Sequence, residues 1–148
     1  MQVSDVMSRD VVVVSPDDSL RQAAYRMDEF NVGALPVCDG ERLVGIVSDR
    51  DMVVRCTSAG ASPDRTPVAD AMTDEVCWCF EDDPVEEVEQ AMARMQIRRM
   101  PVVDGHKRLV GMVSLGDLAT DRAAGSGDTL RAISEPSWPD RSSSLRWR

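Results

Sequence analysis

Two short segments of the chain carry the same polar residues at the same spacing. Residues 42–52, RLVGIVSDRDM, and residues 108–118, RLVGMVSLGDL, are identical at seven of eleven positions. The recurring polar pairs, each a serine followed three residues later by an aspartate, are Ser48 with Asp51 and Ser114 with Asp117. A serine hydroxyl and the free backbone N–H groups of a helix start can bind an anion such as phosphate. An aspartate carboxylate accepts hydrogen bonds only, which suits a pair of donors such as the two hydroxyls of a ribose.

The same spacing has a purely structural interpretation. Ser-x-x-Asp is close to a capping box, in which the two side chains satisfy backbone N–H groups at a helix start and need no ligand. Both roles are compatible with the same residues, so the spacing alone leaves them open. Gly45 and Gly111 precede the two serines by three residues. A glycine in a strand lets another group approach the backbone closely.

The two segments belong to a repeat that extends over most of the chain. With a shift of 65 residues, VSDVMSRDVV at 3–12 aligns with VADAMTDEVC at 68–77, and PVCDG at 36–40 aligns with PVVDG at 101–105. One extra residue near His106 raises the shift to 66 for the Ser-x-x-Asp segments. The chain is therefore predicted to contain two copies of one unit. The predicted parts are a first copy at 1–56, a linker at 57–67, a second copy at 68–121 and a flexible tail at 122–148.

Each copy reads as a mixed α/β (α+β) unit with the element order β-α-β-β-α. Apolar runs at 11–14 and 76–80 predict short buried strands. A helix follows each run, with Asp18 expected as the first cap and Asp83 expected to cap the second helix ahead of Pro84. Two short strands around an Asp-Gly turn come next, and a second helix is expected to begin at Ser48 or Ser114. We expect the two copies to pack about a pseudo-two-fold axis and to form two equivalent clefts between them.

Composition and charge exclude several classes of protein. The formal net charge is -9, so we expect no general nucleic-acid binding, which needs a basic face. No apolar run is long enough for a membrane span, and MQVSDVMSRD lacks the features of a signal peptide, so a cytoplasmic protein is expected. The sequence holds no nucleophile–base set, metal cluster or P-loop, so catalytic residues, bound metal and enzymatic activity are not expected.

The cysteines are predicted to be small buried hydrophobes. Cys77 and Cys79 share one face of a predicted strand, which would also fit a metal site or a redox pair. Three of the four cysteines align with a valine of the sister copy: Cys77 with Val12, Cys79 with Val14 and Cys38 with Val103. Free cysteine is often buried, so the repeat favours packing over metal or redox chemistry. His106 has no cysteine or histidine near it in sequence, and a zinc site is poorly supported.

The span 1–120 resembles a tandem pair of CBS domains, the cystathionine β-synthase-type module that is often called a Bateman module. The matching motifs are DVM and DAM, GALPV and RRMPV, and GIVSDRD and GMVSLGD. Stand-alone pairs of the hypoxic response protein type look most similar. The resemblance implies a non-catalytic sensor of adenosyl ligands, with AMP, ADP or ATP expected first and S-adenosylmethionine or NAD(H) less so. It also implies that the aspartate holds ribose, the serine holds phosphate, and two pairs form a homodimer through their helices.

Carried over residue by residue, the resemblance predicts two unequal clefts. Cleft 1 would be formed by Ser114, Asp117, Arg98, Arg99, Val32, Gly33 and Ala34, with the opening segment Asp5–Met7. Cleft 2 would be formed by Ser48, Asp51, Arg50 and Ile97, with the opening segment Asp70–Met72. Arginine suits phosphate because its planar fork of donors matches the phosphate oxygens. The positions that match Arg98 and Arg99 are Gly33 and Ala34, so cleft 1 is predicted to be the better phosphate site. The alternative is that both arginines are solvated surface charges.

Two functional hypotheses follow. The first is a regulatory module that binds an adenine nucleotide and changes its affinity for a separate, unidentified protein partner. The second is a structural or interaction module with empty clefts, which could respond to redox state through its cysteines.

Overall fold

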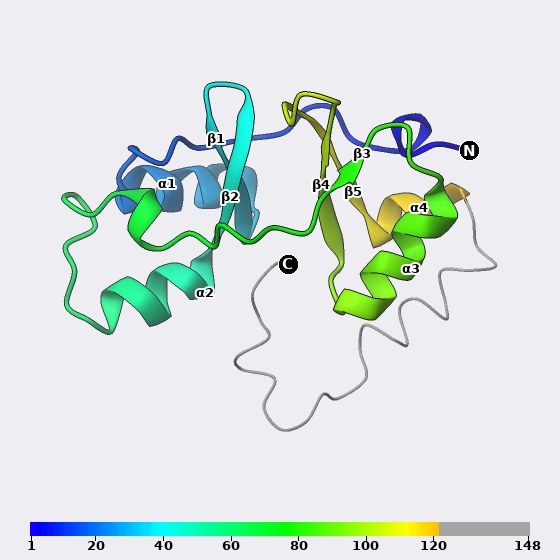
Figure 1. Ribbon diagram of the computed structural model, residues 1–148. Coiled ribbons are helices and arrows are strands. Elements are labelled where there is room, and N and C mark those ends of the chain that lie inside the picture. The colour runs from blue at the N-terminus through cyan, green and yellow to red at the C-terminus, as the bar shows by residue number, and fades with distance from the viewer. Residues whose placement is uncertain (122–148) are drawn as a thin grey trace. The chain divides into compact units, whose positions relative to one another are not determined.

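The computed structural model describes the backbone of residues 1–121 and the side chains of residues 1–118 (Figure 1). The chain forms two compact units. The Ser48 unit comprises residues 12–76, and the Ser114 unit comprises residues 1–11 together with the described residues from Cys77 onward. The predicted tail at 122–148 lies outside the described residues. No described helix has the length and apolar character needed to cross a membrane.

The Ser48 unit contains a two-stranded antiparallel hairpin and the helices that follow and precede it. Its elements are α1 (Leu20–Phe30), β1 (Ala34–Asp39), β2 (Arg42–Ser48), α2 (Asp49–Asp51), the π-helix η2 (Met52–Thr57) and the short helix η3 (Val68–Asp70). The turn between β1 and β2 contains Gly40 at a φ of 63°, a left-handed conformation that glycine adopts without strain. This hairpin confirms the Asp-Gly prediction for the first copy.

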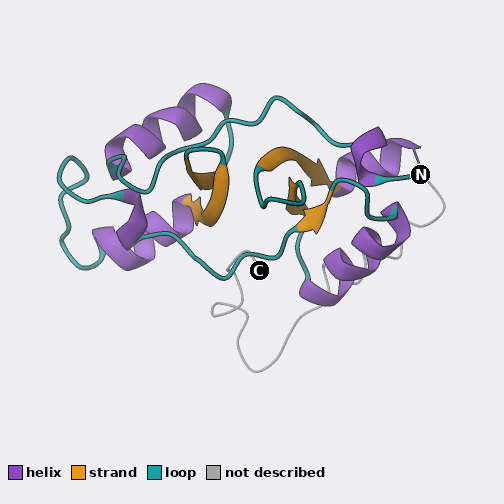
Figure 2. Ribbon diagram, turned by 45° about the horizontal axis from the view of Figure 1, so that its top comes forward, coloured by secondary structure: helices purple, strands orange, loops and turns teal. Residues whose placement is uncertain are grey.

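The Ser114 unit repeats this arrangement with one strand added. Its elements are η1 (Val3–Asp5), β3 (Cys79–Phe80), α3 (Val85–Met95), β4 (Arg99–Val103), β5 (Leu109–Ser114) and α4 (Leu115–Asp121). The strand order is β3-β4-β5, with β3 parallel to β4 and β4 antiparallel to β5. Figure 2 shows the strands of each unit as a small curved sheet beside the helices of that unit. The family-like α/β architecture expected from the repeat is therefore present in both units.

The strands predicted at 11–14 and 76–80 are mostly absent, so their predicted extent is wrong. Residues 11–14 form only an isolated parallel bridge between Val14 and Val37. Of residues 76–80 only Cys79–Phe80 is a strand. An apolar run predicts burial, whereas a β-strand also needs a neighbouring strand that forms hydrogen bonds with it along its whole length. Of residues 11–14 only Val14 is fully buried, at the one position where such a partner lies.

The cap predicted for the first helix is wrong by one residue. The N-cap of α1 is Ser19, whose hydroxyl accepts the Gln22 amide at 3.1 Å while the Gln22 side chain accepts the Ser19 amide at 2.8 Å. Asp18 instead accepts the backbone amide of Ser15 at 2.9 Å. Two neighbouring residues could both cap, and the glutamine three residues beyond Ser19 decides between them by completing a capping box.

The cap predicted for the second helix is also wrong. Helix α3 begins at Val85, and Pro84 occupies the N-cap position without a side-chain cap. The Asp83 carboxylate accepts the backbone amide of Phe80 at 2.9 Å, so it closes the preceding turn and does not cap the helix. Because proline cannot donate a backbone hydrogen bond, its place just outside the helix leaves no N–H group there to satisfy.

Each unit has its own apolar core, and each core contains the opening segment of the other copy. Val3 and Met7, from the start of the first copy, pack with second-copy residues of α3, β4 and β5. Val68 and Ala71, from the start of the second copy, pack with residues of α1, β1 and β2. The two copies have therefore exchanged their opening segments, which explains why the compact units do not coincide with the sequence repeats.

Paired backbone hydrogen bonds fasten each exchanged segment to a strand. The amides and carbonyls of Ser8 and Met112 bond reciprocally at 2.8 and 2.9 Å. Those of Thr73 and Ile46 do the same at 2.8 and 2.9 Å. At both places a glycine sits beside the contact, and its missing side chain is what allows the segment to come close. The close approach predicted at the two glycines is confirmed, and the approaching group is the partner copy's opening segment.

Candidate functional site

Both Ser-x-x-Asp motifs form complete capping boxes. The Ser48 hydroxyl accepts the Asp51 amide at 3.0 Å, and Asp51 Oδ2 accepts the Ser48 amide at 3.2 Å. In the second copy the Ser114 hydroxyl accepts the Asp117 amide at 3.1 Å, and Asp117 Oδ2 accepts the Ser114 amide at 2.8 Å. The structural interpretation of the spacing is confirmed. Each box uses one carboxylate oxygen, Oδ2, and does not engage Oδ1.

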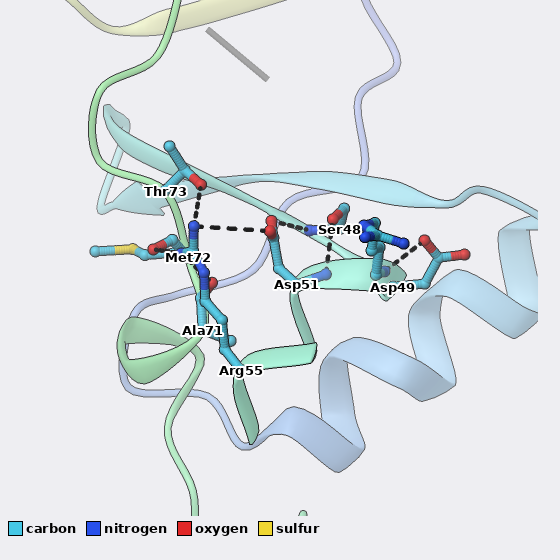
Figure 3. A network of polar contacts seen from close by, with 8 residues as sticks. Ser48, Asp49, Asp51, Arg55, Ala71, Met72 and Thr73 are labelled. Carbon is cyan, nitrogen blue, oxygen red and sulfur yellow. Dashed lines mark hydrogen bonds and ion pairs between the residues drawn. The ribbon is translucent and has the colours of Figure 1, made fainter. Parts of the chain in front are cut away.

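In the Ser48 unit that second oxygen faces an arginine that the sequence analysis missed. Arg55 Nη2 lies 3.9 Å from Asp51 Oδ1, and Arg55 Nη1 donates to the carbonyls of Ala71 at 2.9 Å and Met72 at 3.0 Å. Arg55 Nη2 also donates to the Thr73 hydroxyl at 3.4 Å. Figure 3 shows this network, with Arg55 between Asp51 and residues 71–73. The signal that could have found Arg55 is its spacing of four residues from Asp51, which places both on one helix face.

A second carboxylate borders the motif of the Ser48 unit. Asp49 Oδ1 accepts the backbone amide of Arg50 at 2.7 Å, so it occupies a donor at the helix start. Asp49 Oδ2 lies 3.4 Å from where a Cβ on Gly33 would be, and the Asp49 amide donates to the Gly33 carbonyl at 2.9 Å. The strand end beside this motif is therefore flanked by negative charge, which disfavours an incoming phosphate. The Arg50 side chain is exposed.

The Ser114 unit lacks this carboxylate and instead has two arginines, Arg98 and Arg99, where the Ser48 unit has Gly33 and Ala34. Leu115, which aligns with Asp49, is buried and its amide donates to the Arg98 carbonyl at 2.9 Å. Arg99 pairs with Ser114 across β4 and β5. Both arginines are exposed, and both lie at the strand end next to the motif. The unit thus holds four of the predicted cleft-1 residues together, with Asp117 only half-buried, whereas Asp51 is 7% exposed.

The remaining predicted site residues do not belong to the unit that contains the motif with which they were expected to form a cleft. Val32, Gly33 and Ala34 belong to the Ser48 unit, where Ala34 pairs with Ser48. Ile97 is buried in the Ser114 unit. Their expected contacts with the other unit's motif stay predictions.

The four cysteines form no disulfide, and three of them are buried. Burial raises the pKa of the Cys38 thiol to about 11 and that of Cys79 to about 12. Burial also raises the pKa of Cys56 and Cys77. Because the thiolate is the reactive and metal-binding form, these environments disfavour both kinds of chemistry. Among the described side chains, residues 1–118, no three of histidine, cysteine or acidic type gather as metal ligands would, and the His106 amide donates to Asp104 Oδ1 at 2.8 Å.

The raised thiol pKa of Cys38 predicts a specific loss of stability in alkali. The unfolded thiol ionises near pH 9 while the folded one holds its proton to about pH 11. Its stabilising contribution is therefore fully present below pH 9 and is lost as pH rises to 11, at up to about 1.4 kcal/mol per pH unit. Urea unfolding of wild type and Cys38→Val from pH 8 to 10.5 measures the difference. Equal pH slopes for the two proteins would contradict the prediction.

Comparison with known proteins identifies the repeat. The CBS domain family matches this chain at residues 3–56 and again at residues 68–123. Hypoxic response protein 1 of Mycobacterium tuberculosis is 35% identical over 116 residues, which cover 78% of this chain and 80% of that protein. A crystal structure of that protein with two coordinated zinc ions superposes with a TM-score of 0.74 at 32% identity, covering 81% of this chain and 98% of that one.

Two further solved structures carry adenosyl ligands. CBSX2 in complex with AMP has a TM-score of 0.72 at 27% identity and covers 82% of this chain and 96% of its own. The CBS domain pair of protein MJ0100, in complex with 5-methylthioadenosine and S-adenosyl-L-methionine, has a TM-score of 0.68 at 27% identity, covering 83% and 96%. Inosine-5'-monophosphate dehydrogenase of Methanocaldococcus jannaschii also matches at 36% identity, over 82% of this chain but 23% of that enzyme.

Proposed function

Because the chain belongs to the CBS domain family, we propose that it is a non-enzymatic sensor of an adenosyl ligand. AMP, ADP or ATP is the proposed ligand, ahead of S-adenosylmethionine and NAD(H), and the proposed site is a cleft between the two repeats. The observation that carries the proposal is a half-buried carboxylate, Asp117, whose Oδ2 accepts the Ser114 amide and whose Oδ1 we assign to a ribose hydroxyl. AMP in the CBSX2 structure supports the choice of ligand class. The proposed output is a changed affinity for a separate protein, in the cytoplasm.

We further propose that the Ser114 motif is the stronger of two unequal sites. Arg98 and Arg99 lie at the adjacent strand end, and a buried leucine stands where the other motif has Asp49. A phosphate beside the Ser114 motif would meet two guanidinium groups, and beside the Ser48 motif it would meet a carboxylate.

Binding of AMP and of adenosine tests both proposals. Substituting alanine for Arg98 and Arg99 together is expected to weaken AMP binding by about tenfold to a hundredfold, from the loss of charge-assisted hydrogen bonds. Adenosine, which lacks the phosphate, is expected to bind both proteins equally. Isothermal titration calorimetry measures both ligands. Arg42→Ala is the matched control, since this exposed arginine lies at the far end of β2 from Ser48. If the double variant bound AMP as tightly as wild type, both arginines would be solvated surface charges with no part in binding.

A homodimer formed through the helices is the proposed assembly, with a second copy as the occupant of an apolar face. On the Ser48 unit a groove of about 320 Å³ runs between α1 and the α2–η2 helix. Its lining residues are Leu20, Ala24, Met27, Asp49, Met52, Val53, Thr57 and Pro63. Val53 and Val54 on η2 are 57% and 51% exposed, and Tyr25 on α1 is 67% exposed. A two-fold interface between two chains would bury the same apolar patch on each of them, which favours self-association.

Val53→Glu is expected to convert the dimer to a monomer, because two carboxylates would face each other across the two-fold axis. Sedimentation velocity at micromolar concentration measures the change in mass. Glu41→Gln, on the exposed β1–β2 turn, serves as the control and is expected to leave the dimer intact. A wild-type protein that sediments as a monomer would contradict the proposed assembly.

The rival function is an interaction module with empty clefts, and one observation favours it. Both capping boxes are complete without any ligand, so the recurrence of serine and aspartate is explained by helix capping alone. A folded protein that takes up none of the adenosyl ligands would support this rival. A redox response is the weaker version, since burial raises the pKa of all four thiols.

A further inference from the structure

Arg55 has no counterpart in the second copy. With the shift of 66 residues that aligns the two motifs, its position corresponds to Asp121, a carboxylate that cannot donate to a second carboxylate. The other members of the motif are shared, since Ser48 aligns with Ser114 and Asp51 with Asp117. The two copies therefore differ in sequence at the position whose side chain, in the Ser48 unit, lies near the second oxygen of the motif aspartate.

The Arg55 guanidinium is held by three groups of the exchanged segment. It donates to the carbonyls of Ala71 and Met72 and to the hydroxyl of Thr73, with donor–acceptor distances of 2.9, 3.0 and 3.4 Å. The Arg55 side chain is 26% exposed and that of Asp51 is 9% exposed. A planar guanidinium can hold a carbonyl pair and a hydroxyl at once, which a lysine ammonium on a flexible stem does less well. Arg55 thus links the motif helix to the start of the second copy.

We infer that Arg55 is a latch that sets how many ligands each chain can hold. Its guanidinium forms an ion pair with Asp51 Oδ1 at 3.9 Å, on the side from which a ribose hydroxyl would approach, and it also donates to residues 71–73. The Ser48 motif is consequently closed to ligand, and the Ser114 motif is the one open site. This inference rests on the proposed function, because it assigns a capacity to the adenosyl-ligand sites.

Competition for Asp51 is the physical basis of the latch. Asp51 Oδ2 already accepts the Ser48 amide, so Oδ1 has more acceptor capacity left for a ligand hydroxyl. A ribose hydroxyl is a neutral donor, whereas Arg55 brings a full positive charge to a largely buried carboxylate. A ligand that bound Asp51 Oδ1 would displace Arg55 from this carboxylate and perturb its contacts with residues 71–73. Occupancy of the Ser48 motif and the contact of Arg55 with Asp51 therefore oppose each other.

Amide exchange without ligand tests the latch by itself. The Thr73 amide donates to the Ile46 carbonyl at 2.8 Å, and its aligned counterpart, the Ser8 amide, donates to the Met112 carbonyl at 2.8 Å. Arg55→Gln removes the charge and most of the donors, so it is expected to speed exchange of the Thr73 amide by about tenfold or more, which corresponds to about 1.4 kcal/mol of local opening free energy. The Ser8 amide is expected to be unchanged. Arg65→Gln, which removes an exposed charge from the same unit, is expected to change neither amide.

Isothermal titration calorimetry with AMP tests how many ligands each chain can bind. Wild type is expected to bind one AMP per chain, and Asp51→Ala is expected to leave that stoichiometry unchanged. Arg55→Gln is expected to gain a second site, and adding Asp51→Ala to Arg55→Gln is expected to remove it. Arg55→Lys, which keeps the charge but loses the planar fork, provides a second variant if Arg55→Gln fails to fold, and it is expected to bind a second AMP with weaker affinity than Arg55→Gln.

Each outcome decides between the possibilities. Two AMP molecules per wild-type chain, with one lost in Asp51→Ala, would overturn the inference while supporting the proposed function. One AMP site in Arg55→Gln would overturn the capacity assigned to Arg55, and a Thr73 amide that exchanges as in wild type would also overturn its role as a structural tie. No AMP uptake by folded wild type would refute the proposed function and the capacity assigned to Arg55. In that case faster Thr73 exchange in Arg55→Gln would still establish Arg55 as a structural tie.

Discussion

Gly111→Ala is expected to lower the free energy of unfolding by about 3 kcal/mol, from overpacking and from the loss of paired backbone hydrogen bonds. A Cβ on Gly111 would lie 2.7 Å from both the Ser8 carbonyl oxygen and the Met7 sulfur. The methionine side chain can move, but the carbonyl is backbone and is held by the Met112 amide at 2.9 Å. The added methyl group must therefore push the opening segment off β5.

Urea denaturation monitored by circular dichroism measures this change, and Gly105→Ala is the matched control. Gly105 lies in an exposed turn of the same unit, and a Cβ there would meet nothing within 4 Å. We expect Gly105→Ala to change stability by less than about 0.5 kcal/mol, as surface substitutions usually do. Faster exchange of the Ser8 amide in Gly111→Ala would locate the damage at the exchanged segment. Equal stability of the two variants would show that residues 1–11 do not depend on close contact with this strand.

Asp117→Ala is expected to abolish ligand-induced stabilisation that Asp51→Ala retains. A ligand at a hundred times its dissociation constant stabilises the folded state by about 2.7 kcal/mol, which is visible as a rise of several degrees in Tm. Asp117 is half-buried, whereas Asp51 is 7% exposed and faces Arg55. The expected difference between the two variants follows from these unequal surroundings.

The two aspartate variants control for each other. Each substitution removes one capping box, so each should lower the Tm of the ligand-free protein through a loss of about 1 kcal/mol. The Tm shift on adding ligand is therefore compared within each variant, across AMP, ADP, ATP, NADH and S-adenosylmethionine. A shift lost in Asp51→Ala and kept in Asp117→Ala would reverse the assignment of the open site. Ligand-induced Tm shifts as large as wild type in both variants would show that neither motif aspartate contributes to ligand binding.

Local patterns predicted the elements whose interactions lie within a few residues. The recurring segments at 42–52 and 108–118 predicted two hairpin strands that each lead into a helix at a serine, and β2 and β5 end at Ser48 and Ser114. The capping interpretation held because its hydrogen bonds span three residues. The caps expected at Asp18 and Asp83 failed because adjacent residues competed for the same role, and the choice depended on turns that the pattern does not specify.

The sequence alone thus determined the order of the copies, the hairpins and the two capped motifs. These features depend on periodic patterns and on hydrogen bonds between residues a few positions apart, and both can be recognised in the sequence. Only the tertiary structure decided that each opening segment packs into the core of the other copy. It also showed that the approaching backbone at Gly45 and Gly111 is that segment, which a Cβ at either position would clash with. It also decided that Arg55 reaches residues 71–73, a contact across sixteen to eighteen positions. Such contacts depend on which apolar surfaces find one another when the chain collapses, and no local spacing records that choice.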